Sequence, residues 1–380
     1  MTSDETKARF AAFAAEVEAT SPRARWLVLT HDNPDPDALA ATAVLSLILR
    51  RRFRRRTTVA YGGMIGRAEN REMVRSLKLE LSHLRHLKRR DYQHFALVDC
   101  QPWTGNSQLP KGVVPDLVFD HHPMRKATQA ARLADVRPSY GATATILAEY
   151  LEAAGIAPTR ALATGLVYAI RSETQDFGRE AAGPDHAAYD RLLPRIDRRM
   201  LARIQTARVP FTYFQNLHRA LEGLAGVGNL IVSNLGRVDQ PDIVPEIADL
   251  LLRMEGKTWS LCTGSHGDRL YLSIRTTNPR ADAGNLMRRL IGRRGKGGGH
   301  GTLAGGFIAV DELHPEATRA LERSLARRFA AALRKNPDKL LPLDVAAPRA
   351  AREMPIEANG NGEAREAREP RAAAESERAR

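Results

Sequence analysis

The chain has 380 residues, of which 43% are apolar and 27% are charged, and its formal net charge is +14. This length predicts two domains, and the composition is typical of a globular protein in water. The sequence argues against a membrane-spanning protein, because no apolar run approaches the roughly 20 residues that span a bilayer. It also argues against a secreted protein, because the first residues lack the apolar core of a secretory signal. The two cysteines, Cys100 and Cys262, lie far apart. We therefore expect a cytoplasmic protein with reduced cysteines and no membrane partner.

The positive charge lies in the first 345 residues, because seven arginines balance seven glutamates between residues 346 and 380. Its heaviest clusters are residues 50–56, 88–90 and 288–296. Such a body attracts polyanions, which include nucleotides, nucleic acids and anionic membrane surfaces. The alternative for any one cluster is that its arginines merely cover a solvated helix face.

Strands and helices alternate in the first half of the chain. The patterns predict an amphipathic segment followed by a strand and a helix, then further strands and two helices: 5–19, 26–30, 37–52, 57–61, 95–98, 117–119, 139–154 and 158–171. Such alternation with short connections favours an α/β domain around a mostly parallel sheet.

The second half predicts a smaller mixed α/β domain. Its expected elements are strands over 230–235, 258–264 and 269–274 and helices over 242–254 and 315–334, with a glycine-rich stretch at 295–306. We expect four parts: a first domain over 1–184, a helical connector over 185–225, a second domain over 226–340 and a tail over 346–380. The tail has almost no large apolar residues, so its composition predicts disorder.

Four short segments contain the side chains suited to chemistry. They hold His31, Asp35 and Asp37 after the first strand, then Asp99, then Asp120, His121 and His122, and finally Glu173 and Asp176 after a helical run. The carboxyl ends of parallel strands line one crevice, so we expect the first three groups to converge there.

Convergent carboxylates repel one another unless cations neutralise them. Carboxylate oxygens mixed with imidazole nitrogens suit divalent ions such as Mn²⁺. The number of ligands points to two ions that share a carboxylate, an arrangement that favours in-line phosphoryl displacement. Taken singly, an aspartate at a strand end is often a helix cap or a turn former. The occurrence of all the motifs in this order favours the metal site.

The order HxxxDxD, a strand-end aspartate, DHH and a fourth acidic motif resembles the DHH phosphoesterases over most of residues 25–180. The resemblance implies two Mn²⁺ ions as cofactors. It implies His31 and Asp35 as ligands of one ion, and Asp37 and His121 as ligands of the other. It also implies Asp99 as the carboxylate that bridges both ions.

The same resemblance gives roles to the remaining motif residues. His122 would face the scissile phosphate, and Asp120 would orient the neighbouring histidines. The fourth motif departs from the family, which usually has a TDT-like context where this chain has Ser172-Glu173-Thr174. We expect Glu173 to take the ligand position, with Asp176 as the alternative.

A second strong pattern is KGGGHGTLAGGF, from Lys296 to Phe307. Consecutive glycines can form a phosphate-binding nest of backbone N–H groups, although many glycine-rich loops are only turns. The pattern resembles the DHH-associated C-terminal domain. This implies Gly298, Gly299, His300 and Arg275 as substrate-binding residues. For Arg275 the alternative is a surface salt bridge.

The resemblance is greatest to members that degrade short oligoribonucleotides, some of which also remove the 3′-phosphate from 3′-phosphoadenosine 5′-phosphate. We thus expect a two-metal phosphodiesterase that releases nucleoside monophosphates from oligonucleotide substrates, with catalysis in a crevice between the domains. A homodimer is among the expected assembly states. The alternatives are a cyclic-dinucleotide phosphodiesterase, a manganese pyrophosphatase, which the GGGH motif disfavours, and a nucleotide-binding sensor that has lost turnover, which the departure at Glu173 favours.

Overall fold

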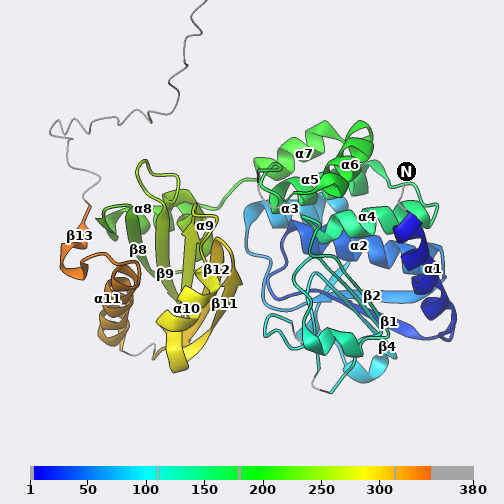
Figure 1. Ribbon diagram of the computed structural model, residues 1–380, viewed down its shortest axis with the longest axis horizontal. Coiled ribbons are helices and arrows are strands. Elements are labelled where there is room, and N and C mark those ends of the chain that lie inside the picture. Colours follow the sequence, from blue (N-terminus) through cyan, green and yellow to red (C-terminus); the bar gives the residue numbers. More distant parts are fainter. Residues whose placement is uncertain (1–3, 108, 111, 179–180, 312–313, 344–380) are drawn as a thin grey trace, which may run out of the picture. The chain divides into compact units, whose positions relative to one another are not determined.

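Figure 1 shows the computed structural model of the chain, which describes residues 4–107, 109–110, 112–178, 181–311 and 314–343. The first half forms a six-stranded, fully parallel sheet in the order β3-β2-β1-β4-β5-β6. Its strands are β1 (Arg25–Leu29), β2 (Arg56–Tyr61), β3 (Leu81–His83), β4 (His94–Val98), β5 (Leu117–Asp120) and β6 (Leu133–Val136).

Both faces of this sheet are buried, which explains why its strands read as nearly continuous apolar runs. Successive side chains of a strand point to opposite faces. Trp26 and Val28 of β1 therefore enter one core, and Leu27 and Leu29 enter another. The first core is covered by the helices α1 (Asp4–Glu18), α2 (Pro36–Arg51), α3 (Ala68–Leu77), α4 (Thr143–Ala153) and α5 (Arg160–Glu173).

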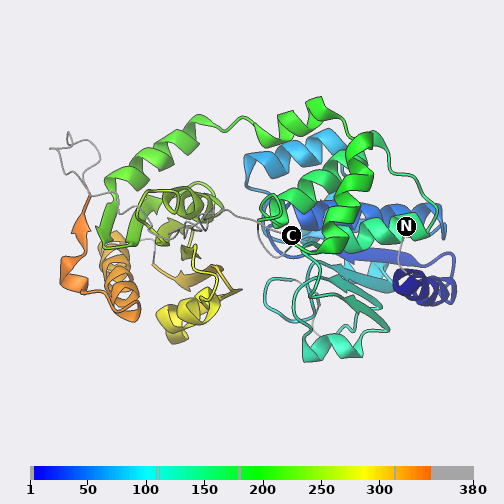
Figure 2. The same ribbon diagram turned by 45° about the horizontal axis from the view of Figure 1, so that its top comes forward.

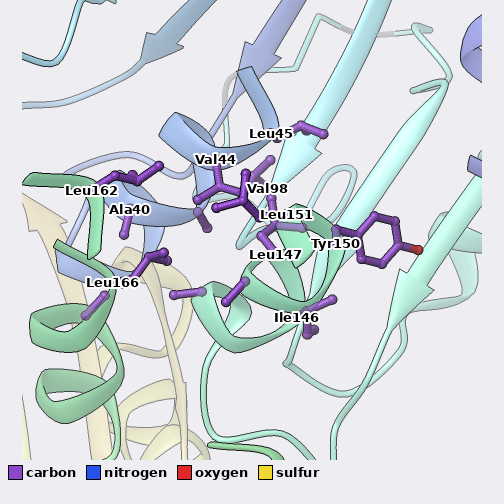
Figure 3. Packing of buried hydrophobic residues seen from close by; sticks show 14 of the residues in the cluster. Ala40, Val44, Leu45, Val98, Ile146, Leu147, Tyr150, Leu151, Leu162 and Leu166 are labelled. Atoms are coloured by element: carbon purple, nitrogen blue, oxygen red, sulfur yellow. The ribbon is translucent and has the colours of Figure 1, made fainter. Parts of the chain in front are cut away.

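The helix α2 lies in the middle of the first core. Figure 3 shows Val44 and Leu45 of α2 packed close to Leu147 of α4, with Leu166 of α5 nearby. Most α2 side chains are buried, so this helix has almost no polar face. This extensive burial fixes the position of both of its ends relative to the sheet.

The predicted connector is divided between two cores. Its first helices, α6 (Gly183–Leu192) and α7 (Arg198–Gln205), contribute Ala188, Leu201 and Ile204 to the core of the parallel sheet, and both views show them beside α5 (Figures 1 and 2). The third, α8 (Phe211–Glu222), packs through Ala220 against the second sheet. Apolar burial, rather than sequence position, assigns each helix to its domain.

The second half forms a mixed seven-stranded sheet in the order β11-β12-β10-β9-β8-β7-β13, in which only β8 and β9 pair in parallel. Its strands are β7 (Leu224–Val227), β8 (Leu230–Arg237), β9 (Trp259–His266), β10 (Arg269–Thr276), β11 (Gly295–His300), β12 (Leu303–Ala309) and β13 (Leu341–Pro342). The helices α8 and α9 (Ile243–Leu251) cover one face, and α10 (Ala283–Ile291) and α11 (Pro315–Ala332) cover the other.

The glycine-rich stretch differs from the predicted phosphate-binding nest. Residues 295–300 form the strand β11, which pairs with β12 so that Gly298 lies opposite Gly305. The glycines allow α10 to approach the sheet closely: a Cβ atom on Gly297 would lie 2.5 Å from Cδ1 of Ile291, and one on Gly284 would clash with the carbonyl of Gly299. Close helix packing therefore explains Gly284 and Gly297, whereas Gly298 faces open space.

The predicted fold class, α/β with a parallel first sheet and a smaller mixed second domain, is confirmed. The predicted disordered tail, 346–380, lies outside the described residues. Within the described ranges, none of the helices combines the length and the apolar character needed to cross a bilayer.

A buried ionic network anchors α1 and α4 to the edge of the first sheet. Arg137 lies 2.6 Å from Oδ2 of Asp135 and 2.9 Å from Oε2 of Glu149. Thr6 of α1 donates a hydrogen bond of 2.6 Å to Glu149, and Tyr150 donates one of 2.8 Å to Asp135. Every charge in this network has a partner, which is the condition under which buried ions are tolerated.

We expect Arg137→Met to lower the free energy of unfolding by about 3–5 kcal/mol, because it leaves Glu149 buried without a cation and leaves Asp135 with Arg9 alone. Arg132→Met is the matched control: the Arg132 side chain is 61% exposed and lies 3.5 Å from Asp116, so its loss should cost less than about 1 kcal/mol. Urea denaturation of both variants measures the difference. Equal effects of the two substitutions would contradict the proposed anchoring role.

Candidate metal and phosphate site

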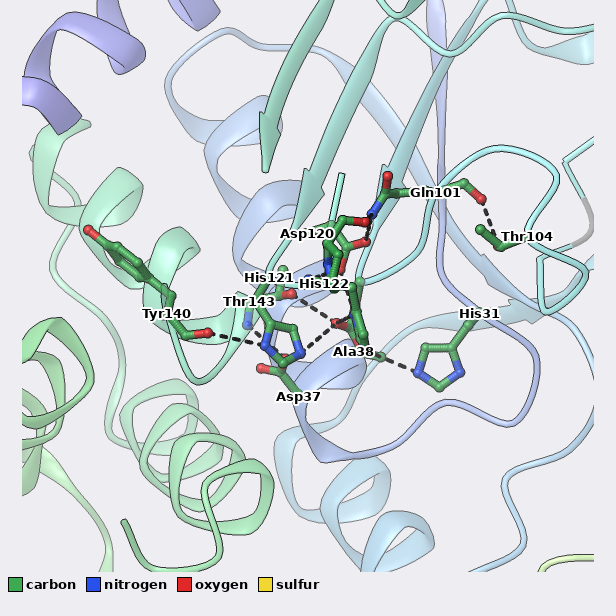
Figure 4. Close-up of polar contacts among 12 residues, drawn as sticks. His31, Asp37, Ala38, Gln101, Thr104, Asp120, His121, His122, Tyr140 and Thr143 are labelled. Carbon is green, nitrogen blue, oxygen red and sulfur yellow. Dashed lines mark hydrogen bonds and ion pairs between the residues drawn. The ribbon is translucent and has the colours of Figure 1, made fainter. Parts of the chain in front are cut away.

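The candidate residues of the first domain lie where three neighbouring parallel strands end. His31 and Asp35 follow β1, Asp99 follows β4, and His121 follows β5. Figure 4 shows the site from close by. The convergence predicted from the strand-end motifs therefore occurs in the folded chain.

One group of possible metal ligands consists of His31, Asp35 and Asp99, whose ligand atoms all lie within 4.8 Å of one another. Nε2 of His31 is 3.3 Å from Oδ2 of Asp99 and 3.8 Å from Oδ2 of Asp35. Its Nδ1 lies 2.8 Å from the carbonyl oxygen of Asp32. A carbonyl partner on Nδ1 is the arrangement that leaves Nε2 available to a metal.

A second group consists of Asp99, His121 and His122. Nε2 of His121 is buried and has no hydrogen-bond partner among the described residues. It lies 3.8 Å from Oδ1 of Asp99 and 4.0 Å from Oε1 of Glu173. These distances are too long for hydrogen bonds but suit ligands of one cation, and a cation would satisfy the buried nitrogen. The donor set of imidazole and carboxylate groups therefore fits a divalent metal ion.

Asp99 belongs to both groups. Its Oδ2 faces His31, and its Oδ1 faces His121 and accepts a 2.8 Å hydrogen bond from the hydroxyl of Thr143. The backbone of Asp99 has a φ of 58°, a left-handed conformation that is strained for most residues other than glycine, asparagine and aspartate. This turn at the end of β4 aims the carboxylate at both groups.

Asp37 is predicted to be a metal ligand, but its carboxylate also binds the backbone. Its oxygens accept hydrogen bonds of 2.8 and 2.7 Å from the backbone N–H groups of Thr143 and Ala144, at the beginning of α4. Burial, together with the charges of Asp99, Glu173 and Asp35, raises the pKa of Asp37 well above its ordinary value. Neither three-residue group contains Asp37, and its role as a ligand stays a prediction.

Asp120 holds the imidazole of His122. Its Oδ1 accepts a 2.8 Å hydrogen bond from Nδ1 of His122, and its Oδ2 accepts one of 2.7 Å from Nε2 of Gln101 (Figure 4). Burial opposes protonation of His122, but the attraction of Asp120, Asp99 and Glu173 outweighs it and raises the pKa of His122 to about 9. The ring is therefore an imidazolium at neutral pH, with a side chain that is 36% exposed.

The fourth acidic motif brings Glu173, and not Asp176, to the second group. Glu173 is the last residue of α5 and approaches His121. Asp176 is 67% exposed and lies 2.5 Å from Nε of Arg171. Its backbone φ of 55°, like those of its neighbours Gln175 and Phe177, marks a left-handed turn that separates it from the helix.

The candidate substrate residues of the second domain lie on two strands. Nε of Arg275 on β10 is 2.6 Å from Oδ1 of Asp249, and the Arg275 side chain is only 11% exposed. Gly298 and Gly299 lie in β11. His300 ends that strand, and its side chain lies outside the described part of the chain.

Three supporting residues were not predicted from the sequence. Thr143, Gln101 and Asp249 each hold a candidate site residue through a side-chain hydrogen bond. Thr143 lies inside the helix predicted over 139–154 and is the first residue of α4, where threonine is too common to be a strong signal. Gln101 and Asp249 belong to no motif, since their importance arises only from contacts in space.

Each half of the chain matches the model of a known protein family. Residues 25–170 match the family model "DHH family, N-terminal domain", and residues 228–327 match the "DHHA1 domain" model. An uncharacterized protein of Methanocaldococcus jannaschii is 35% identical over 290 residues, which are 76% of this chain and 59% of that protein. The match therefore spans less than two thirds of the relative.

Two solved structures are also similar. An exopolyphosphatase-related protein from Bacteroides fragilis has a TM-score of 0.65 and 14% identity, covering 84% of this chain and 96% of that one, which shows a shared fold. The match to a pGpG-specific phosphodiesterase from Vibrio cholerae covers 80% of this chain and 99% of that one at 14% identity, but its TM-score of 0.28 does not show a shared fold.

We predict that divalent metal binding releases a proton from His31. Burial opposes protonation of this ring, but attraction to Asp35 and Asp99 raises its pKa well above 6.5. The ring therefore keeps its proton to a higher pH than a free imidazole does, and it must lose that proton before Nε2 can bind a metal. Metal affinity should therefore rise about tenfold per pH unit from pH 6.5 towards that raised pKa.

Calorimetric titration of Mn²⁺ into the full chain, in two buffers of different ionisation enthalpy, measures the released protons. His31→Asn should remove this part of the release and flatten the pH dependence. Binding that is independent of pH between 6 and 8, with no proton release, would remove His31 from the ligand set.

Glu173→Gln and Asp176→Asn form a matched pair that tests the fourth motif. We expect Glu173→Gln to weaken binding of at least one metal ion by about 10-fold or more, because the carboxylate approaches His121. Asp176→Asn should change the affinity less than twofold, since its side chain is exposed and paired with Arg171. The same calorimetric titration applies, and the reverse order of effects would assign the ligand to Asp176.

Proposed function

Because this chain belongs to the DHH family of phosphoesterases, we propose that it is a metal-dependent hydrolase that cleaves short oligonucleotides to nucleoside monophosphates. The observation that carries the proposal is the position of Asp99, whose two oxygens face two separate groups of possible metal ligands. A carboxylate shared in this way is the central element of a two-metal phosphoryl-transfer site.

The residues that would hold the two ions fall into two sets. His31, Asp35 and Asp99 would hold one ion, and Asp99, His121, Asp37 and Glu173 would hold the other. Mn²⁺ is the proposed ion, because mixed imidazole and carboxylate ligands suit it. When bound, such ions supply Lewis acidity that lowers the pKa of a water and neutralises charge on the phosphoryl oxygens.

His122 is the proposed catalytic side chain. Its Nδ1–H is held by Asp120, which Gln101 fixes in turn, so the ring cannot rotate freely. As an imidazolium it can present its Nε2–H to a phosphoryl oxygen, where negative charge develops during attack on phosphorus. Asp120 acts as a positioning residue, since it retains the proton on Nδ1 and sets the ring orientation.

The second domain is proposed to hold the substrate. Two donor groups of Arg275, Nε and Nη1, already bond to Asp249 and to the carbonyls of Ile274 and Ala304. Within the described residues its Nη2 forms no hydrogen bond, so this group can donate to a substrate phosphate. Gly298 leaves open space beside its backbone for the same phosphate, and His300 is proposed to add a donor.

Removal of the 3′-phosphate from 3′-phosphoadenosine 5′-phosphate would use the same groups, because it is hydrolysis of a similar ester on a nucleotide of similar size.

Both cysteines are unpaired and buried, as expected in a reducing compartment, so the cytoplasm is the proposed location.

We predict that the purified full chain converts a 5′-phosphorylated adenosine dinucleotide to AMP with Mn²⁺, and that chelation abolishes turnover. Asp99→Asn should lower the rate by more than about 100-fold, because the carboxylate proposed to bind both ions is lost. Asparagine tolerates the left-handed backbone and can still accept the Thr143 hydrogen bond, so the fold should be retained. Asp176→Asn is the control and should keep its activity. Chromatography of the products measures all three proteins.

Cyclic dinucleotide, 3′-phosphoadenosine 5′-phosphate and pyrophosphate serve as parallel substrates. Cleavage of one of them without turnover of the linear dinucleotide would replace the substrate but keep the site. Wild-type turnover by Asp99→Asn would end the two-metal assignment. Metal and nucleotide binding without cleavage of any compound would indicate a sensor.

A further inference from the structure

A separate groove lies at the other end of α2. It has a volume of about 710 Å³ and is formed by the second half of α2, the beginning of β2 and residues 78–82. Its lining combines apolar side chains, such as Leu47 and Leu79, with hydroxyl groups, such as those of Ser46 and Thr57. This volume lies within the range of about 300–1,000 Å³ that is usual for small-molecule sites.

The groove is distinct from the candidate metal site. The helix α2 begins beside Asp37 at the metal site and ends at the groove with Arg50 and Arg51. Its 16 residues span roughly 22 Å at about 1.5 Å per residue. In the parallel sheet, Thr57 lies near the amino end of β2, whereas Asp99 lies beyond the carboxyl end of β4. The two sites therefore lie at opposite edges of the same sheet.

Three cations line the groove: Arg50, Arg51 and Lys78. Arg50 lies 3.5 Å from Glu80, which is 86% exposed, so this pair is weak and screened by solvent. Within the described residues, neither Arg51 nor Lys78 has an acidic partner at ion-pair distance. The groove thus keeps an excess of positive charge that the fold itself does not use.

The arginine-rich segment 50–56 contains one residue with a different role. Arg55 is buried, and its guanidinium donates hydrogen bonds to the carbonyls of Val17 and Thr20 and to the hydroxyl of Thr20. The other five arginines of the segment are exposed. The structure therefore separates one structural arginine from a set of cations that face solvent beside the groove.

The chemistry of the lining defines the class of ligand. Arginine, lysine and hydroxyl groups are the usual donors to phosphate oxygens. The apolar wall of Leu47, Val59 and Leu79 suits the body of an organic ligand. Among the residues that the structure describes, no aromatic side chain lines the groove, so these residues offer no platform for the base stacking that binds single-stranded nucleic acid.

We propose that this groove binds a small ligand with at least two linked phosphate groups, of the nucleoside diphosphate class. Arg51 and Lys78 would hold the phosphates, and the apolar wall would contact the nucleoside. This inference goes beyond the proposed hydrolysis and does not depend on it, because none of the groove residues belongs to the metal site.

The test is binding of ADP and of inorganic pyrophosphate to the full chain, measured by calorimetry with excess chelator to prevent hydrolysis. Arg51→Glu should weaken ADP binding at least tenfold. Ala43→Trp should do the same without any change of charge, because Ala43 lines the groove and is partly exposed. Arg54→Glu is the matched control: it makes the same charge change in the same segment, but Arg54 does not line the groove.

The outcomes distinguish binding in the groove from binding elsewhere on the chain. Loss of binding in Arg51→Glu and Ala43→Trp, with less than twofold change in Arg54→Glu, supports the proposal for whichever phosphate compound binds. Loss only in Arg275→Ala would place the ligand in the second domain and overturn it. Equal loss in Arg51→Glu and Arg54→Glu would indicate diffuse charge attraction and overturn it as well. Binding of a 20-nucleotide RNA without binding of ADP or pyrophosphate would identify a nucleic-acid surface instead.

Discussion

Repulsion among carboxylates that meet at one edge of a parallel sheet is the constraint on which the rest of the site depends. Asp37 and Asp99 are almost completely buried there, and Asp35 and Glu173 lie close by. In a medium of low polarity such charges cannot be left without compensation. The chain supplies part of it: the first N–H groups of α4 bind Asp37, Thr143 bonds to Asp99, and the surrounding carboxylates raise the pKa of both His31 and His122. The remaining negative charge is what would attract divalent ions.

The Arg137 network shows how the same chain treats buried charge when no ligand is required. There each carboxylate has a guanidinium, hydroxyl or phenol partner, and the group is closed. At the strand ends, by contrast, Nε2 of His121 is buried without a hydrogen-bond partner among the described residues. Most buried polar groups in proteins are satisfied. An unsatisfied imidazole beside several carboxylates therefore distinguishes a site built for a ligand from one built for stability.

The two ends of α2 illustrate how one buried helix can serve two surfaces. Its first residues carry Asp37, and Asp35 accepts a hydrogen bond from the backbone of Ala38 as the N-cap. Its last residues carry Arg50 and Arg51 into the groove. Acidic groups at the beginning of a helix and basic groups at its end both agree with the helix dipole. Most side chains of the helix are buried in the core, so each end is held in a defined place.

Much of this protein could be predicted from its sequence, because the relevant signals are local. Apolar runs followed by acidic residues predicted both the parallel sheet and the convergence of His31, Asp99 and His121 at its carboxyl edge. The physical reason is that parallel strands place their ends together, whatever the details of packing. The glycine-rich pattern did not indicate the strand β11, because glycine permits close packing of α10 on β11 as readily as it permits a tight turn.

Only the tertiary structure decided the contacts between distant segments. It placed Asp99 between two ligand groups, set the N–H groups of α4 against Asp37, and brought Glu173 rather than Asp176 towards His121. It also divided the predicted connector between two cores and separated Arg55 from its exposed neighbours. Sequence alone determined which side chains each element carries and the edge of the sheet they reach. Their partners lie on elements that can be more than a hundred residues away in the chain. Local periodicity does not encode which of these distant elements pack together.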